Sequence, residues 1–331
     1  MSKGGFNMVK GLALALVLAV VSSILGNYLI SAAVVALLLG MAIRYFIKDI
    51  SPYSHGLNFA SKKILRISII LLGSGLSLDV ILRTGMFSLI VMVFTLLAAF
   101  GCGHIIGKWF KMDWRLSSLI SAGTGICGGS AIAALSPVIE ADESQVAYAI
   151  SATFIFDIIM VILFPLMGRA LGLSDLAFGL WAGTAINDTS SVVAASYAFS
   201  DAAGEFATIV KLTRTLALIP IIVIFSIITT KKNANAKGIK SINLSSVFPW
   251  FIVLFLLLAI INTIGFIPAA VSAQLSSISK FLMVIALGAI GLKTDINKLR
   301  QSGFLPMLHG FLISAIVVVV SLAVQIFIGQ V

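Results

Sequence analysis

Four charged residues lie inside otherwise apolar stretches of this 331-residue chain. Asp157 and Asp188 are acids, whereas Lys211 and Arg214 are cations three positions apart, which places them on one face of a helix. Charged side chains within lipid-spanning segments are costly and mark substrate or ion pathways. We therefore predict that Asp157 or Asp188 binds a coupling ion, either H+ or Na+, and that Lys211 and Arg214 bind a substrate.

Each of these residues also has a structural alternative. Asp188 could cap a helix by accepting backbone N–H groups. Asp157 could be the partner of a nearby cation. Lys211 and Arg214 could extend along the helix to the membrane surface and keep their charges in water.

Two stretches of glycine and small polar residues, 123–130 and 183–190, resemble one another: Gly-Thr-Gly-Ile-Cys-Gly-Gly-Ser and Gly-Thr-Ala-Ile-Asn-Asp-Thr-Ser. Glycines weaken a helix, and freed backbone groups at membrane depth are tolerated only inside protein or beside water. Paired interrupted helices are typical of a transporter's substrate site. The predicted substrate-binding residues are Thr124, Gly125, Cys127, Gly128, Gly129, Ser130, Thr184, Asn187, Asp188, Thr189, Ser190, Lys211 and Arg214.

The direction of the helical halves bears on the sign of the substrate. The halves after each break should begin near Ser130 and Ser190 and run in the same direction. Their N-termini carry partial positive charge, and two of them converging on one cavity would favour a small anion. If one acid is neutralised by a proton or Na+, the cavity becomes net positive.

Composition determines the fold class. The chain is 60% hydrophobic and 10% charged, whereas soluble domains carry about a quarter charged residues. We therefore predict an all-α polytopic membrane protein that forms one domain over 1–331. Eleven transmembrane helices are expected, with those at 116–138 and 176–199 interrupted. They lie at about 10–26, 29–47, 62–82, 85–107, 116–138, 145–168, 176–199, 206–230, 247–267, 279–297 and 303–329.

Lysines and arginines predict the orientation, because they accumulate in cytoplasmic loops. With eleven spans and a cytoplasmic N-terminus, 18 of the 22 fall on the cytoplasmic side, Arg169 among them. The C-terminus is then extracytoplasmic. This distribution explains the net charge of +10 without nucleic acid as a partner.

A second pair of stretches predicts internal symmetry. The stretches 71–80 and 287–296 align without a gap, and each precedes a basic turn and another apolar span. The related segments are about 62–110 and 279–329. The first begins in the third predicted span and the second in the tenth. These two spans cross the membrane in opposite directions, so the copies are inverted, as in many carriers. Chance similarity between two Gly/Leu-rich helix ends is the alternative.

The two interrupted helices do not fit that symmetry. They are the fifth and the seventh predicted spans, which enter the membrane from the same side, so they are not inverted copies of one another. A local error in the span count, a re-entrant segment, or a diverged symmetry partner would each explain this.

These motifs carry a family resemblance. Gly-Ser-Gly-Leu-Ser-Leu at 73–78, with Gly123–Ala134 and Gly183–Ala195, makes nearly the whole chain similar to the YeiH-type bacterial membrane proteins, whose family label is sulfate exporter. A weaker resemblance is to the bile-acid, arsenite and riboflavin transporter superfamily, although Cys127-Gly-Gly-Ser130 lacks that superfamily's proline and spacing. The resemblance implies secondary active transport in the bacterial inner membrane.

We therefore predict a carrier for a small anion, sulfate or a related sulfur oxyanion or sulfonate, exported by alternating access. A sodium- or proton-coupled organic-acid carrier and a cation/proton antiporter are alternatives, followed by a channel and a membrane-embedded sensor. The sequence contains no nucleotide-binding motif, paired nucleophile and base, or metal cluster, so we expect no enzyme, metal site or cofactor. Expected partners are the anion and the lipid bilayer, and a homodimer is left open.

Overall fold

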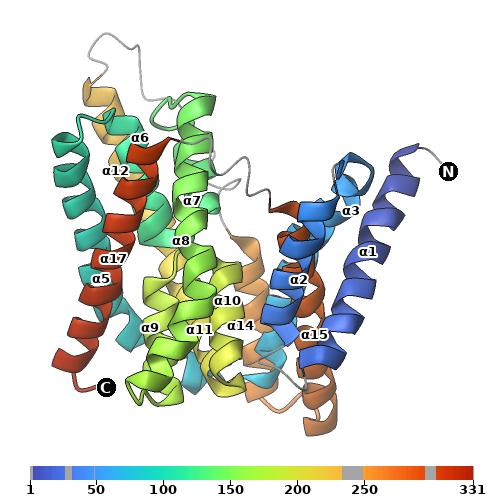
Figure 1. The fold of residues 1–331 in the computed structure, drawn as a ribbon. Coiled ribbons are helices and arrows are strands. Elements are labelled where there is room, and N and C mark those ends of the chain that lie inside the picture. Colours follow the sequence, from blue (N-terminus) through green and yellow to red (C-terminus); the bar gives the residue numbers. More distant parts are fainter. Residues whose placement is uncertain (1–2, 27–31, 48, 233–248, 295–302, 331) are drawn as a thin grey trace. The chain divides into compact units, whose positions relative to one another are not determined.

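The computed structural model describes residues 3–26, 32–47, 49–232, 249–294 and 303–330 (Figure 1). These parts of the chain are almost entirely helical and contain no strand. The predicted all-α class is therefore confirmed.

Within the described parts of the chain, six helical segments are long and apolar enough to cross a membrane. Two shorter apolar helices, α2 (Ala32–Phe46) and α14 (Trp250–Thr263), accompany them. The chain is thus a polytopic membrane protein, as predicted. The long segments are α1 (Lys3–Gly26), α5 (Leu78–Trp109), α8 (Glu143–Ala170), α11 (Asp201–Leu216) with α12 (Leu218–Lys232), α15 (Ala269–Lys293) and α17 (Phe304–Phe327).

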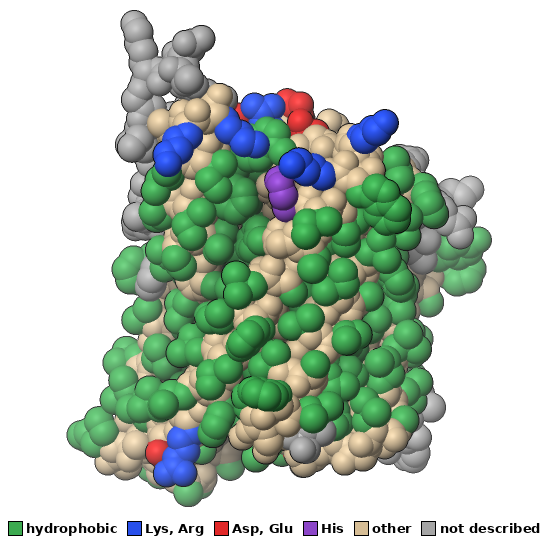
Figure 2. All heavy atoms as spheres, turned by 90° about the vertical axis from the view of Figure 1, so that its left-hand side faces the viewer, with side chains coloured by type: hydrophobic (Ala, Val, Ile, Leu, Met, Phe, Trp, Pro, Cys, Tyr) green, Lys and Arg blue, Asp and Glu red, His purple; other side chains and the backbone are tan. Residues whose placement is uncertain are grey.

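The protein surface agrees with this assignment. On the face drawn in Figure 2, hydrophobic side chains cover the middle, and the described lysines, arginines and acids gather at the upper and lower edges. On α5, Met86 and Leu97 are 70% and 65% exposed. Large apolar side chains exposed along a helix of this length are expected where lipid surrounds the protein.

The chain divides into two compact units. Unit 1 contains 1–83, 193–205 and 250–298, and unit 2 contains 84–192, 206–249 and 299–331. Three helices continue from one unit into the other: α5, α10 (Thr189–Phe199) and α11. The prediction of a single domain stays a prediction.

Unit 1 is built on close helix packing. A Cβ atom at Gly40 of α2 would lie 2.6 Å from the Gly288 carbonyl oxygen of α15, so only glycine permits this approach. The helical run before α5 is made of η1 (Ser51–Tyr53), α3 (Ser54–Phe59), the π-helical η2 (Ala60–Ile64), α4 (Leu65–Leu72) and η3 (Gly73–Gly75).

Helix α15 also packs against α4, and the two helices are antiparallel. Ser279 Oγ donates to Ser68 O at 2.7 Å, and Ser272 Oγ donates to Ser74 O at 2.8 Å. An inverted repeat requires this orientation, but the repeat itself stays a prediction. Residues 295–302, which include the end of the second aligned stretch, lie outside the described residues.

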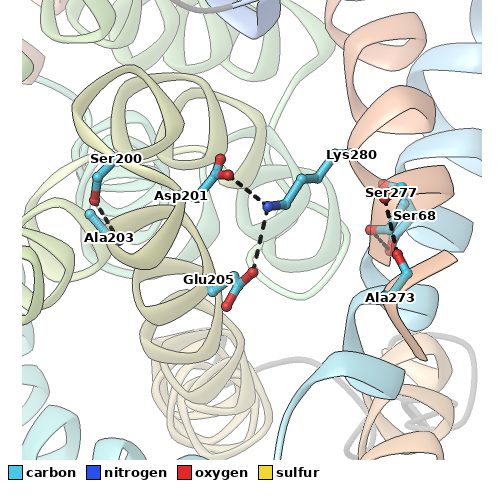
Figure 3. A network of polar contacts seen from close by, with 9 residues as sticks. Ser68, Ser200, Asp201, Ala203, Glu205, Ala273, Ser277 and Lys280 are labelled. Atoms are coloured by element: carbon cyan, nitrogen blue, oxygen red, sulfur yellow. Dashed lines mark hydrogen bonds and ion pairs between the residues drawn. The ribbon is translucent and has the colours of Figure 1, made fainter. Parts of the chain in front are cut away.

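Unit 1 also holds a group of charged side chains, drawn in Figure 3. Lys280 of α15 lies between two acids of α11, with its Nζ 2.8 Å from Asp201 Oδ2 and 3.8 Å from Glu205 Oε1. Because one lysine is shared by two acids that join the same two helices, we call this group of three residues the α11–α15 ion pair. Its side chains are 31% to 71% exposed.

In unit 2, the first interrupted helix turns back on itself. It consists of α6 (Trp114–Ala122), the π-helical η4 (Gly123–Cys127) and α7 (Gly129–Leu135). Arg115 Nε donates to Ile139 O at 2.9 Å, so the chain leaves at the level where it entered. A straight crossing of this length would separate the two residues by about 36 Å. The predicted span 116–138 is therefore wrong as a crossing: it is re-entrant, and we call it the first hairpin.

The second interrupted helix, α9 (Asp175–Ala185) followed by α10, begins at the other end of α8. Gln145, at the start of α8, donates to Asp113 Oδ1 at 3.0 Å, which places the start of α8 at the base of the first hairpin. Helix α8 has 28 residues and is therefore about 42 Å long. Asp175 follows its far end.

Helix α10 returns to the side from which α9 comes. The run α11–α12 ends at Lys232, whose Nζ lies 3.9 Å from the Trp114 ring centroid at the base of the first hairpin. Lys211 and Arg214 of the same run bind carbonyls at the breaks, so 206–210, the residues of α11 that precede them in unit 2, lie on the opposite side of the break from Lys232. The predicted crossing 176–199 is re-entrant as well, and we call it the second hairpin.

The two re-entrant hairpins change the predicted topology. They remove two of the eleven predicted crossings. Arg169, however, lies at the end of α8 remote from Asp113, whereas Lys108, Arg115 and Lys232 gather at the near end. The prediction that Arg169 shares a side with these cations is therefore wrong.

Candidate functional site

The tips of the two hairpins meet. A Cβ atom at Gly128, in the first tip, would lie 2.8 Å from Asp188 Oδ1, in the second. Gly128 has a φ of 64° and a ψ of −136°, a conformation that suits glycine. The second predicted break, near 183–189, lies at 186–188, where the chain leaves helical geometry. In the first, predicted near 123–129, residues 123–127 instead form a π-helical turn, and the chain leaves helical geometry at Gly128.

Lys211 joins the two tips. Its Nζ donates to Ile126 O at 2.9 Å, to Ile186 O at 3.0 Å and to Asn187 O. An ammonium group has three protons, and all three are used here. Each acceptor is a carbonyl that a broken helix leaves without an intrahelical partner.

Arg214, one turn further along α11, binds the same kind of acceptor. Its Nε donates to Gly125 O and its Nη2 to Thr124 O, both at 2.6 Å, and its Nη1 donates to Thr184 O. Lys211 and Arg214 are 0% and 1% exposed. The alternative that they extend to the membrane surface is therefore wrong: they cap the carbonyl ends of the first halves of both hairpins. Their role in substrate binding stays a prediction.

The two acids bind backbone N–H groups at the second tip. Asp157 Oδ1 accepts from Asn187 N at 2.9 Å, and its Oδ2 accepts from Asp188 N at 3.0 Å. Asp188 Oδ2 accepts from Ser190 N at 2.9 Å and from the Ser190 hydroxyl. The helix-capping alternative for Asp188 is thus what the geometry shows. The partners of Asp157 are N–H groups at the start of α10, and ion coupling by either acid stays a prediction.

These four residues form a balanced set. Two cations bind carbonyls at helix C-termini and two carboxylates bind N–H groups at a helix N-terminus, which is the favourable pairing at each end. Their formal charges cancel. A net positive cavity, as predicted, therefore requires that one acid bind a proton or a cation.

The tips also have an accessible part. Ser130 is exposed, Gly129, Asp188 and Thr189 are half-buried, and a Cβ atom at Gly129 would meet nothing within 4 Å. The predicted second halves do begin here, with α7 at Gly129 and α10 at Thr189. The prediction that they run in the same direction is wrong, because the hairpins enter from opposite ends of α8. The remaining predicted residues are buried, namely Thr124, Gly125, Cys127, Gly128, Thr184, Asn187 and Ser190.

The sequence analysis missed the buried hydroxyls of α17. Ser314 Oγ lies 3.3 Å from Asn187 Nδ2 and 3.4 Å from Thr124 Oγ1, and Ser321 Oγ lies 2.6 Å from Thr184 Oγ1. Ser314 and Ser321 are seven positions apart in an apolar helix and therefore lie on one face. That spacing was a usable signal.

The fold and the site can be compared with known proteins. A "UPF0324 membrane protein" of Clostridium tetani is 57% identical over 97% of both chains. Proteins with the same description from Streptococcus agalactiae and Fusobacterium nucleatum are 40% and 37% identical, over at least 97% of each chain. Residues 10–328 match the family described as "Conserved hypothetical protein 698". The similarity to YeiH-type proteins is thereby confirmed, and this chain belongs to that family of membrane proteins.

Proposed function

We propose that this protein is a secondary active transporter that moves a small anion by alternating access. The observation that carries the proposal is the meeting of two re-entrant hairpins, from opposite ends of α8, at tips joined by Lys211. Discontinuous helices that end near the middle of a bilayer build the substrate and ion sites of many carriers.

The tips provide a place for a solute. Unwound backbone at membrane depth is stable only when it is buried in protein or lines a wet cavity. Lys211, Arg214 and Asp157 bury most of it, and Ser130, Thr189 and Asp188 remain accessible. These three residues are our first candidates for contact with substrate, through hydroxyl and backbone groups.

An anion that enters this set should move with a compensating charge. The buried charges cancel, and an added negative charge in a poorly screened region is unfavourable. Symport with H+ or Na+, or exchange for another anion, removes that cost. Asp188 is the better candidate for proton coupling because it is half-buried, whereas Asp157 is fully enclosed.

The chemical class of the anion follows the family label given to YeiH-type proteins. Sulfate or a related sulfur oxyanion or sulfonate is the first candidate, and export is the expected direction. A cation/proton antiporter is the second candidate function, because Asp188 is a half-buried carboxylate that accepts from the Ser190 hydroxyl. A sodium- or proton-coupled organic-acid carrier uses the same site.

The proposal includes an orientation. The end of unit 2 with Lys108, Arg115 and Lys232 would face the cytoplasm, since cytoplasmic loops are rich in lysine and arginine. This keeps the N-terminus cytoplasmic and the C-terminus extracytoplasmic in a bacterial inner membrane.

Flux in proteoliposomes tests the function. The purified protein should accumulate labelled sulfate, sulfite or a short sulfonate under an imposed Na+ or pH gradient, with saturation and competition among the three. Asp188→Asn should abolish a pH-gradient response while leaving anion exchange. Transport of a monovalent cation with no movement of any anion would contradict the anion proposal and favour the antiporter.

A further inference from the structure

The two hairpins are bound by the same side chains at matching positions. The stretches 123–126 and 183–186 share the pattern Gly-Thr-x-Ile. Arg214 donates to the backbone carbonyls of both threonines, and Lys211 donates to those of both isoleucines. The hairpins enter from opposite ends of α8. Matching contacts in opposite orientations indicate that the hairpins are inverted copies of one another around a shared pair of cations.

Helix α17 continues this correspondence. The hydroxyl of Thr124 faces Ser314 at 3.4 Å, and the hydroxyl of Thr184 faces Ser321 at 2.6 Å. The two serines are seven positions apart, which is about 10.5 Å along a helix. One helix thus offers a buried serine to the equivalent threonine of each hairpin. We call these two the first-hairpin contact and the second-hairpin contact.

The two contacts are unequal. Hydrogen bonds between hydroxyl groups usually measure about 2.5–3.0 Å. The second-hairpin contact, at 2.6 Å, is therefore closed, whereas the first-hairpin contact, at 3.4 Å, is longer than a normal bond. The backbone differs as well, because 123–127 form a π-helical turn and α9 stays α-helical to Ala185. Two equivalent segments therefore have two conformations in one molecule.

Exchange of these conformations gives an equivalent arrangement that faces the other side of the membrane. Carriers with inverted repeats alternate access by moving one repeat against the other around a fixed site. The exchange leaves the Thr184 hydroxyl with a partner, because its Oγ1 also donates to Leu180 O at 2.6 Å. The second-hairpin contact can therefore open without leaving that hydroxyl unpaired.

We propose that the two contacts close alternately during transport. In this structure Ser321 holds the second hairpin. In the opposite access state, Thr124 closes on Ser314 and Thr184 leaves Ser321. Both serines are positioning residues, since they act through the hairpins. The proposal rests on the proposed function, because it requires two access states of a carrier.

Paired cysteines report each contact without any solute. The two native cysteines are first replaced by alanine. One protein then carries Thr184→Cys with Ser321→Cys, and another carries Thr124→Cys with Ser314→Cys. Disulfide formation with copper phenanthroline is timed in proteoliposomes. A disulfide is about 2.05 Å long, so the pair at the second-hairpin contact should form its bond at least tenfold faster. Equal rates would contradict the inequality of the contacts.

The decisive measurement is the coupling between the contacts. Thr184→Val removes the hydroxyl that bonds Ser321 and keeps the backbone carbonyl. In the protein with cysteines at Thr124 and Ser314, it should speed cross-linking at least fivefold, because opening one contact favours closure of the other. Ser321→Ala should do the same.

Thr95→Ala is the matched control for loosening of the fold. It removes a buried hydroxyl that bonds only within its own helix, α5, and should leave the cross-linking rate unchanged. An unchanged rate in both Thr184→Val and Ser321→Ala would overturn the proposal, and so would an equal increase in Thr95→Ala.

Flux separates these contacts from the transport function. A disulfide at either contact should block flux of sulfate, sulfite or a short sulfonate, and reduction should restore it. Coupled cross-linking without flux of any of these anions would overturn the proposed function and leave the alternating contacts. Flux that continues through both cross-linked proteins would leave the function and overturn the alternation.

Discussion

Helix α11 contributes to two charged clusters that differ in their burial and in the groups that their charged side chains bind. At its start, Asp201 and Glu205 bind Lys280 in the α11–α15 ion pair, with side chains partly in water (Figure 3). Further along, Lys211 and Arg214 are buried and bind only backbone carbonyls among the bonds that the structure shows. The first cluster joins side chains to side chains, and the second joins side chains to broken backbone.

The difference concerns what each charge does for folding. An exposed ion pair contributes about 0–1 kcal/mol, because water competes for both partners. Removal of one partner from a buried charged set costs about 3–5 kcal/mol, because the other groups are left without compensation. We therefore expect the cations at the tips to stabilise the breaks strongly and the ion pair to contribute little to folding.

Lys211→Met should have the largest effect. It leaves Ile126 O, Ile186 O and Asn187 O without their shared donor and removes one buried positive charge. We expect a loss of about 3–5 kcal/mol in the free energy of unfolding, or failure to fold. The measurement is unfolding in mixed detergent micelles, with Lys280→Met as the matched control. Equal losses of unfolding free energy in Lys211→Met and Lys280→Met would show that the two clusters contribute equally to folding and would contradict this prediction.

Asp157→Asn should follow. The amide keeps the size of the side chain but offers one acceptor oxygen to two N–H groups, those of Asn187 and Asp188. Hydrogen bonds to a charged group contribute about 1.5–3 kcal/mol, and a loss of that size is expected in the same assay. Asp79→Asn, at an exposed acid, is the control and should change stability little. A neutral result at Asp157 would show that its charge is not needed at the break.

Gly128→Ala tests the contact between the tips. A side chain there requires a strained backbone conformation, and its Cβ would lie 2.8 Å from Asp188 Oδ1. We expect a loss of about 1–3 kcal/mol and a reduced anion flux. Gly129→Ala is the matched control, since its Cβ would meet nothing within 4 Å and α7 favours alanine. Comparable losses at both positions would argue against close contact of the tips.

Lys280→Gln should have the smallest effect. The Lys280 ammonium group is partly hydrated, so its removal should cost less than about 1 kcal/mol, and high salt should reduce even that difference. The variant is compared with wild type in low and high salt. A salt-insensitive loss of several kcal/mol would place the ion pair in the same energetic class as the tips.

The sequence by itself determined where the helices break and which residues carry the unusual charges. Glycine and small polar residues in apolar runs located both breaks, because helix weakening is a local property. The long apolar runs likewise indicated a polytopic membrane protein, since the length and composition of a span are local too.

Only the tertiary structure decided the direction of the hairpins and the partners of the charges. A half-helix that returns and one that continues have the same composition, so 116–138 and 176–199 were mistaken for crossings. Lys211 and Arg214 bind carbonyls 24 to 90 positions away in the sequence, and no local pattern specifies such acceptors. The contacts of the Asn187 side chain were equally invisible, because other helices bring Thr153 O and Ser314 Oγ beside its Nδ2, and its Oδ1 has no hydrogen bond among the described residues.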